Sequence, residues 1–262
     1  MSGIIFQRTY QLGEEYEAIK KNASEFLSEY LAYPNLIAFN DFERSVTFST
    51  EKLIPSPSTN RPRVMLLFSN AHPYSVYQGM FLSPNTRGVE NAFWPVMESS
   101  GWLPISKKNR NPKQLADICL KAEYPGPFEL IFYCYYAFPT DYPKDLGKIF
   151  EGDFYNQVIQ PEAMEAFWEA IQDNAVKAVV TFNKEIFNLV SKEPSKRPID
   201  HLMGGELIQS QIKGADRRIP IFLTFPTGWR FRHDITHSRI VSLEKIRTAI
   251  SSELGVKKSK RP

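Results

Sequence analysis

Short apolar runs alternate with stretches of helical periodicity along this chain. The apolar runs lie at residues 64–68, 130–136, 175–182 and 220–225. Their length and nearly continuous apolar character are typical of strands buried on both faces of a sheet. Apolar side chains recur at helical steps in residues 13–32, 161–172 and 242–250, and further helices are expected to begin at Phe93 and Lys184. This alternation predicts an α/β protein, a three-layer α/β/α sandwich with a mainly parallel central sheet.

Turn-forming residues divide the chain. Residues 56–62 read Ser-Pro-Ser-Thr-Asn-Arg-Pro, which predicts a loop between residues 1–60 and the rest. The amphipathic pattern of residues 13–32 predicts a helical N-terminal extension over residues 1–60. We expect the main domain over residues 61–255 and a basic tail over residues 256–262.

Composition narrows the class of protein. The chain has 262 residues, of which 42% are apolar and 23% charged, and this is enough to bury a sizeable core. Its longest apolar stretch, residues 130–138, is far shorter than the roughly 20 residues of a membrane helix, and no secretory signal is expected. The two cysteines exclude a disulfide framework and favour a reducing compartment. We therefore expect a cytoplasmic protein without membrane association.

Polar segments follow the first and last apolar runs. Residues 69–91 are rich in proline and glycine, and loops this long are usually functional. Ligands of α/β sheets bind at loops that leave the carboxyl ends of strands, which makes residues 69–91 and 226–237 the candidate binding segments. Asn70 stands directly beyond a buried strand, where its amide can be held rigidly. The alternative for Asn70 is an ordinary turn residue that bonds its own backbone.

Basic residues crowd the C-terminal part of a chain whose net charge is +3. Besides the basic tail, they are Arg217, Arg218, Arg230, Arg232 and Arg239. This distribution is a weak indication of a polyanionic partner. No phosphate-binding glycine motif occurs, and His233 and His237 alone are a poor metal site. We expect neither a metal nor a cofactor.

Several ordered motifs resemble those of one family of DNA repair enzymes. They are Asn-Ala-His-Pro-Tyr-Ser at 70–75, Gly-Met-Phe at 79–81, Asn-Ala-Phe-Trp-Pro at 91–95, Val-Val-Thr-Phe-Asn-Lys at 179–184 and Phe-Pro-Thr-Gly-Trp-Arg-Phe at 225–231. These motifs and their order are similar to those of the mismatch-specific uracil/thymine-DNA glycosylases of the uracil-DNA glycosylase superfamily. The likeness covers roughly residues 62–254, and it implies the fold of that superfamily.

The resemblance also implies a reaction and a set of residues. Such enzymes flip a deaminated or damaged base out of DNA and hydrolyse its N-glycosidic bond. The implied catalytic residues are Asn70, which would position water, His72 and Thr227. The implied base-binding residues are Ser69, Tyr74, Phe81, on which the base would stack, and Phe225. The implied DNA-binding residues are Gly228, Trp229 as a wedge, Arg230, Arg232 and His233. The partner would be a damaged duplex or single-stranded DNA, bound by a monomer in the bacterial nucleoid or a eukaryotic nucleus.

Two departures from the family pattern leave other functions open. Phe225 stands where the family has His or Asn, and it cannot donate a hydrogen bond to the departing base. Ala71 and His72 stand where Pro and Gly are usual, so His72 either narrows the pocket or supplies the missing donor. One alternative is a nucleic-acid-binding homologue without catalysis. Another is an N-glycoside hydrolase that acts on a small nucleoside.

Overall fold

The computed structural model describes residues 3–56, 59–150, 152–215, 217–228 and 235–256. Its centre is an eight-stranded sheet with the order β1-β3-β5-β4-β6-β8-β7, in which β2 also pairs with β3. The strands are β1 (Ile5–Gln11), β2 (Ile37–Asn40), β3 (Ser45–Leu53), β4 (Arg63–Asn70), β5 (Glu129–Tyr136), β6 (Ala178–Thr181), β7 (Ile208–Gln211) and β8 (Pro220–Leu223).

The four apolar runs form the parallel centre of this sheet. Strands β5, β4, β6 and β8 lie next to one another in that order, and each pair is parallel. Every residue of β5, β6 and β8 is buried, because helices cover both faces and leave no side of these strands to solvent. Antiparallel strands flank this centre, with β3 beside β5 and β7 beside β8. The predicted α/β class and mostly parallel sheet are confirmed.

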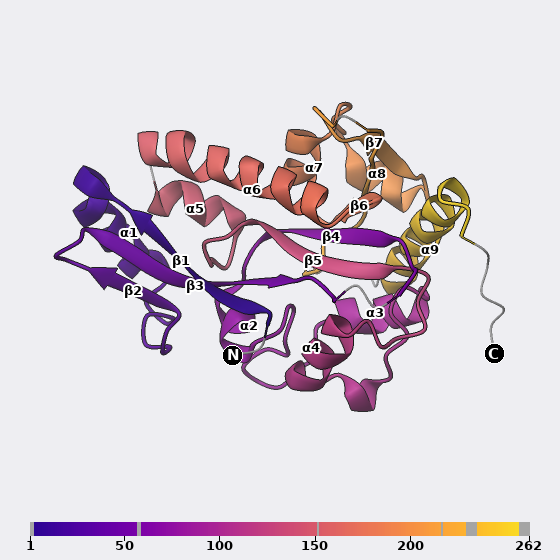
Figure 1. The fold of residues 1–262 in the computed structure, drawn as a ribbon, viewed down its shortest axis with the longest axis horizontal. Coiled ribbons are helices and arrows are strands. Elements are labelled where there is room, and N and C mark those ends of the chain that lie inside the picture. The colour runs from indigo at the N-terminus through magenta and orange to yellow at the C-terminus, as the bar shows by residue number, and fades with distance from the viewer. Residues whose placement is uncertain (1–2, 57–58, 151, 216, 229–234, 257–262) are drawn as a thin grey trace.

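Helices lie on both sides of the sheet. They are α1 (Tyr16–Phe26), α2 (Pro73–Gln78), α3 (Phe93–Ser99), α4 (Pro112–Leu120), α5 (Pro143–Ile149), α6 (Gln160–Asp173), α7 (Lys184–Val190), α8 (Pro198–Met203) and α9 (Thr236–Glu253). Figure 1 shows α5, α6 and α7 on one side and α2, α3 and α4 on the other. Residues 69–91, expected to be a loop, contain the short helix α2, and α9 begins six residues before Ser242. Among the described residues, no helix has the length and apolarity of a membrane span.

The direction of the connections explains this layering. The chain passes from β4 to β5 on one side of β4, and then from β5 back across β4 to β6 on its other side. Since parallel crossovers are right-handed, two crossovers in opposite directions place their helices on opposite faces. The carboxyl ends of β4 and β6 therefore border a point where the chain turns to both sides, which is where such sheets bind ligands.

Residues 1–60 contain more than the expected helix. Helix α1 lies within the predicted amphipathic stretch, but strands β1, β2 and β3 were not expected. Residues 45–50, Ser-Val-Thr-Phe-Ser-Thr, are β-branched, aromatic or small and favour a strand. Strand β3 then pairs with β5 through Lys52 and Leu53, so a helical extension describes only part of this segment.

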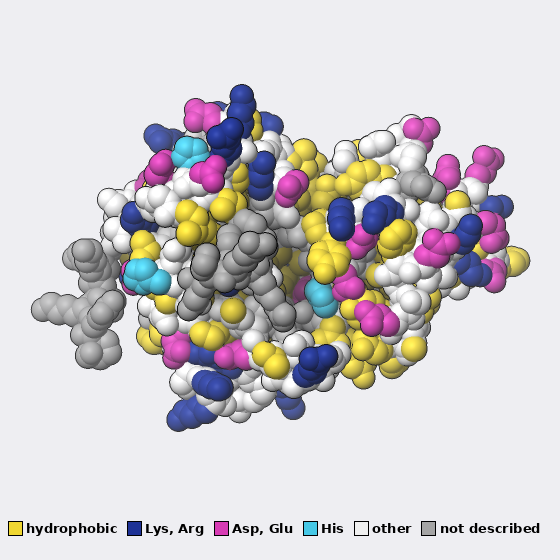
Figure 2. All heavy atoms as spheres, turned by 180° about the vertical axis from the view of Figure 1, so that it is seen from behind, with side chains coloured by type: hydrophobic (Ala, Val, Ile, Leu, Met, Phe, Trp, Pro, Cys, Tyr) yellow, Lys and Arg dark blue, Asp and Glu magenta, His cyan; other side chains and the backbone are white. Residues whose placement is uncertain are grey.

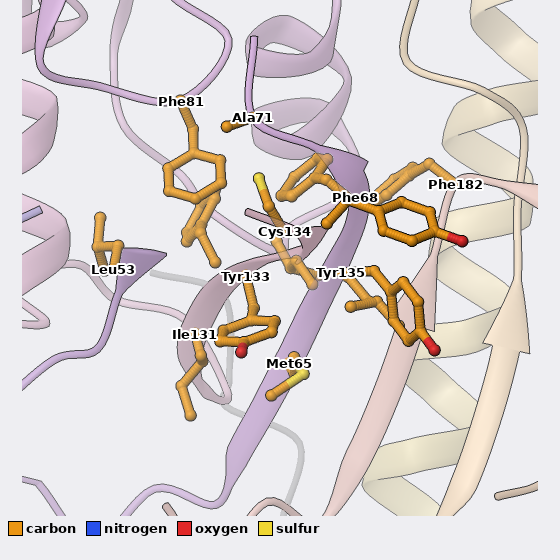
Figure 3. Close-up of a cluster of buried hydrophobic side chains, with 14 of the residues drawn as sticks. Leu53, Met65, Phe68, Ala71, Phe81, Ile131, Tyr133, Cys134, Tyr135 and Phe182 are labelled. Atoms are coloured by element: carbon orange, nitrogen blue, oxygen red, sulfur yellow. The ribbon is translucent and has the colours of Figure 1, made fainter. Parts of the chain in front are cut away.

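Aromatic side chains fill the core near the ends of β4 and β5. Phe68 stacks on Phe182 with ring centroids 5.2 Å apart and an interplanar angle of 8°. Phe81 packs against Phe68 at 5.4 Å and against Phe132 at 5.6 Å. Figure 3 shows this cluster together with Cys134 of β5. The cluster makes the carboxyl end of the sheet rigid, because close-packed rings leave little room for movement.

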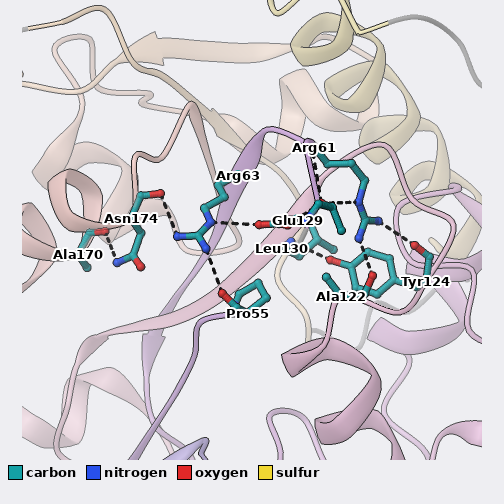
Figure 4. A network of polar contacts seen from close by, with 10 residues as sticks. Pro55, Arg61, Arg63, Ala122, Tyr124, Glu129, Leu130, Ala170 and Asn174 are labelled. Atoms are coloured by element: carbon teal, nitrogen blue, oxygen red, sulfur yellow. Dashed lines mark hydrogen bonds and ion pairs between the residues drawn. The ribbon is translucent and has the colours of Figure 1, made fainter. Parts of the chain in front are cut away.

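A buried ion pair fastens the opposite end of the sheet. Arg63 Nε, at the start of β4, lies 3.1 Å from Glu129 Oε2, at the start of β5. The other oxygen of Glu129 accepts hydrogen bonds from the backbone and hydroxyl of Thr59 at 3.2 and 2.5 Å. Arg61 donates to the carbonyl groups of Ala122 and Tyr124 (Figure 4). These contacts hold the loop before β4 against the amino ends of the strands.

Candidate functional site

A cavity of about 800 Å³ opens at the carboxyl ends of the parallel strands. Its walls come from the carboxyl ends of all four of these strands and the segments that follow them. They include Ser69 and Asn70 at the end of β4, Asp141 and Tyr142 after β5, Phe182 and Asn183 after β6, and Thr227 and Gly228 after β8. This is the position and the size expected for a small-molecule or cofactor site in an α/β sheet. Figure 2 shows a recess in one face of the molecule with apolar, acidic and histidine side chains around it.

The amide of Asn70 is held in one orientation. Its Nδ2 donates to the carbonyl oxygen of Thr140 at 2.5 Å, to Thr140 Oγ1 at 3.0 Å and to the carbonyl of Ala71 at 3.0 Å. Its Oδ1 accepts from the hydroxyl of Ser69 at 2.9 Å. Because the two N–H groups are already bonded, the side chain offers a ligand only the second lone pair of Oδ1. Asn70 is thus a fixed acceptor on the cavity wall. A simple turn residue bonds only its own nearby backbone, whereas Asn70 also bonds Thr140.

His72 contributes an imidazole to the same wall. Its Nε2 lies 3.3 Å from Asp141 Oδ1, which also accepts a hydrogen bond from the hydroxyl of Tyr30 at 2.8 Å. Burial lowers the pKa of His72, and the negative charge of Asp141 opposes this shift. Burial thus favours the neutral imidazole over the charged form.

Three phenylalanines form the apolar wall of the cavity. Gly79 ends α2 at a φ of 78°, a left-handed conformation that favours glycine, and the chain turns there toward Phe81. Phe81 lines the cavity but is only 2% exposed, since it packs against Phe68. Phe182 also lines the cavity and was not predicted. The available signal was its place as the last apolar residue of the third run, just before Asn183.

Asn183 and the turn after β8 complete the rim. Asn183 caps α7 by accepting a hydrogen bond from the backbone of Ile186 at 3.0 Å. Arg239 of α9 donates to the carbonyl of Pro226 at 2.8 Å, which fixes the turn that carries Thr227 and Gly228. Arg239, one of the basic residues that suggested a polyanionic partner, therefore has a contact within the fold.

Two of the predicted base-binding residues lie away from the cavity. Phe225 is buried in a small cluster with Leu202 and Ile235, so its ring does not line the cavity. Tyr74 lies on α2, where its ring packs at 6.4 Å from both Tyr33 and Tyr77.

The remaining predictions divide into two groups. Those that the structure brings together around one cavity are Ser69, Asn70, His72, Phe81, Thr227 and Gly228. Those that lie outside the described residues are Trp229, Arg230, Arg232 and His233. On the face shown in Figure 2, basic and acidic side chains are interspersed. The expected contacts to DNA phosphates therefore stay predictions.

Sequence reasoning missed Glu51, the one carboxylate that strand β3 contributes to the cavity. It is 3% exposed and lines the wall near His72. Burial raises the pKa of Glu51 to about 8, and a hydrogen bond from the His72 backbone acts in the opposite direction. The only signal in the sequence was a charged residue within a stretch that favours a strand. Its position in residues 1–60, outside the resemblance, removed it from consideration.

The described site has the chemistry of polar recognition. It combines a fixed amide acceptor, an imidazole, hydroxyl groups and a buried carboxyl beside an aromatic wall. Among the described residues, no group of three or more His, Cys, Asp or Glu side chains is placed to hold a metal ion. In the comparison with known proteins, no family model matches this chain and no curated protein is detectably similar to it in sequence.

Proposed function

We propose that this chain is a DNA glycosylase with the fold of the uracil-DNA glycosylase superfamily. It would flip a deaminated or damaged base of the uracil type and hydrolyse the N-glycosidic bond. The observation that carries the proposal is the fixed Oδ1 acceptor of Asn70 on the same cavity as Phe81 and the Thr227 turn. These are the residues through which the sequence resembles that superfamily.

The arrangement suits a reaction in which bond breaking precedes attack. An amide oxygen is too weak a base to deprotonate water, but it can hold one water molecule by accepting its hydrogen bond. That is sufficient when the sugar already carries oxocarbenium character. The bond between sugar and base breaks, the water oxygen bonds to the sugar carbon, and the proton released by this water ends on the base.

The size and walls of the cavity favour a flipped nucleotide over a smaller ligand. A volume of about 800 Å³ lies within the range of pockets that bury a ligand of drug size. The wall of Phe81 and Phe182 is apolar, as a base face requires, and the polar groups stand at other sides. A monomer that acts on chromosomal DNA, in a nucleoid or a nucleus, follows from this function.

Excision from defined duplexes tests the proposal. The chain is incubated with duplexes that carry uracil, hypoxanthine, xanthine or ethenocytosine, and abasic sites are revealed by alkaline cleavage. We expect abasic product from at least one of them. Asn70→Ala is expected to lower the rate by roughly 10²–10³, the effect of losing one preorganised polar contact. The matched control is Asn156→Ala, which removes an exposed asparagine that does not line the cavity. No product from well-folded wild type on any duplex would refute the proposal.

Phe225 favours a second candidate, a nucleic-acid-binding protein without catalysis. Its buried ring offers no hydrogen bond to a departing base. This candidate would bind DNA with an affinity that falls as salt rises, because phosphate contacts release counterions. It would form no abasic product, and Asn70→Ala would leave its affinity unchanged. The same set of duplexes therefore separates the two functions.

A further inference from the structure

Glu51, a residue that lines the cavity, has an unsatisfied carboxyl oxygen. Its Oε2 is buried and has no hydrogen-bond partner among the described residues. Leaving a buried polar atom unpaired costs roughly 1–3 kcal/mol, so such atoms are rare unless a ligand or water completes them. The cavity is the open side next to this carboxyl. A ligand in this cavity is therefore a candidate partner for the carboxyl of Glu51.

The surroundings of Glu51 are apolar or uncharged. On β1 its strand partner is Ile5. On β5 it faces the thiol of Cys134, and burial together with the Glu51 carboxyl raises the pKa of that thiol. From the start of α2 it faces the backbone N–H of His72. No described lysine or arginine shifts its pKa, while the ionisable side chains elsewhere on the cavity are His72, Asp141, Tyr142, Lys184 and Glu185.

This environment keeps the carboxyl protonated near neutral pH. Burial raises its pKa to about 8, above the pH of most cells. A protonated carboxyl has an O–H donor, which an ionised one lacks. A carboxylic acid kept neutral by an apolar site is a known device for stabilising negative charge on oxygen.

We propose that Glu51 donates a hydrogen bond from its carboxyl to a carbonyl oxygen of the base in the cavity. The inference rests on the proposed function and names its substrate class, a base with a ring carbonyl group. As the N-glycosidic bond breaks, negative charge spreads onto that oxygen, and a fixed donor stabilises it more strongly. Glu51 keeps its proton throughout. It would supply, from β3, the donor that Phe225 cannot supply.

Excision rates as a function of pH test this role. Single-turnover rates on a uracil duplex are measured between about pH 6 and pH 9. Wild type is expected to lose activity as pH rises through about 8, where Glu51 ionises. Glu51→Gln keeps a neutral donor, so we expect it to stay active with no such loss. Glu51→Ala should be roughly 10²–10³ slower than wild type near pH 7, and this ratio should shrink above about pH 8, where wild type also loses its donor. Glu165→Gln, an exposed residue of α6, should behave as wild type.

Two results would overturn the role of Glu51. One is an Ala variant as fast as wild type, and the other is a Gln variant with the same alkaline loss as wild type. Either result, with excision intact, contradicts the role of Glu51 and leaves the proposed function standing.

Binding of free uracil, followed by nuclear magnetic resonance, tests the role of Glu51 independently of the glycosylase function. If no excision occurs but uracil binds to wild type and Glu51→Gln and not to Glu51→Ala, the glycosylase function fails and the role of Glu51 in recognition stands. If neither excision nor binding that depends on Glu51 occurs, both are contradicted. The intact chain is used in every measurement.

Discussion

At the scale of single residues, the site depends on side chains whose environment fixes their chemical state. Asn70 can act only as an acceptor, because its N–H groups are bonded to Thr140 and Ala71. Burial and His72 decide the charge of Glu51. Neither property belongs to the residue type alone, and the same residues on a surface would behave differently.

The raised pKa of Glu51 has a consequence for stability. The folded chain keeps a proton on Glu51 up to about pH 8, whereas the unfolded chain loses it near pH 4.5. The carboxyl therefore destabilises the fold progressively as pH rises between these values. Glu51→Gln has no such proton, so its free energy of unfolding should exceed that of wild type by an amount that grows over this range.

Urea unfolding of both proteins from acid to alkaline pH measures this difference. The difference in the free energy of unfolding between Glu51→Gln and wild type should level off above about pH 8. It should reach a few kcal/mol at most, which is the size that the raised pKa of Glu51 implies. Glu165→Gln provides the control, because that carboxyl is exposed. A constant difference between wild type and Glu51→Gln across the range would show that Glu51 is ionised in the fold.

At the scale of elements, the strands and their ends are the most predictable part of the molecule. Apolar runs such as 64–68 and 130–136 identified β4 and β5, because strands covered on both faces need nearly every side chain apolar. The position of Asn70 just beyond the apolar run 64–68 also identified it, and in the structure it is the last residue of β4. The strands before residue 60 were not predicted, because their apolar and polar residues show no clear period. The amphipathic pattern of helix α1 was the clearest signal in that segment. Glu51 was not predicted for the same reason, since its place on the cavity depends on β5, a partner strand far away in sequence.

The ion pair at the amino ends of β4 and β5 gives a prediction at this scale. Glu129 is 1% exposed and pairs with Arg63 (Figure 4). Glu129→Ala leaves a mostly buried guanidinium without its partner, which should lower the free energy of unfolding by roughly 3–5 kcal/mol. Lys121→Ala breaks an exposed pair with Asp117 on α4 and should change stability by less than about 1 kcal/mol.

Thermal or urea unfolding at neutral pH compares these two variants with wild type. Because the network lies at the amino ends of the strands, Glu129→Ala should keep the cavity residues in place in the folded fraction. Equal stability of the two variants would mean that the buried network does not hold the sheet.

At the scale of the whole molecule, the cavity is built by parts of the chain that are distant in sequence. Strand β3 joins β5 through Lys52 and Leu53, and this pairing brings Glu51 to a wall otherwise made by residues at the end of β4 and after β4, β5, β6 and β8. The N-terminal segment thus contributes to the site although it lies outside the resemblance. No pattern in the sequence predicts that Glu51 lines the cavity, because this position arises only when β3 pairs with β5.

The most direct measurement is a crystal structure of Asn70→Ala bound to a duplex that carries uracil, the variant being chosen to slow excision. We expect the uracil outside the base stack, with its ring against the Phe81 and Phe182 wall and a ring carbonyl within hydrogen-bond distance of the Glu51 carboxyl. A uracil that remains paired in the duplex, or one bound on another surface of the chain, would contradict the assignment of this cavity as the base-binding site.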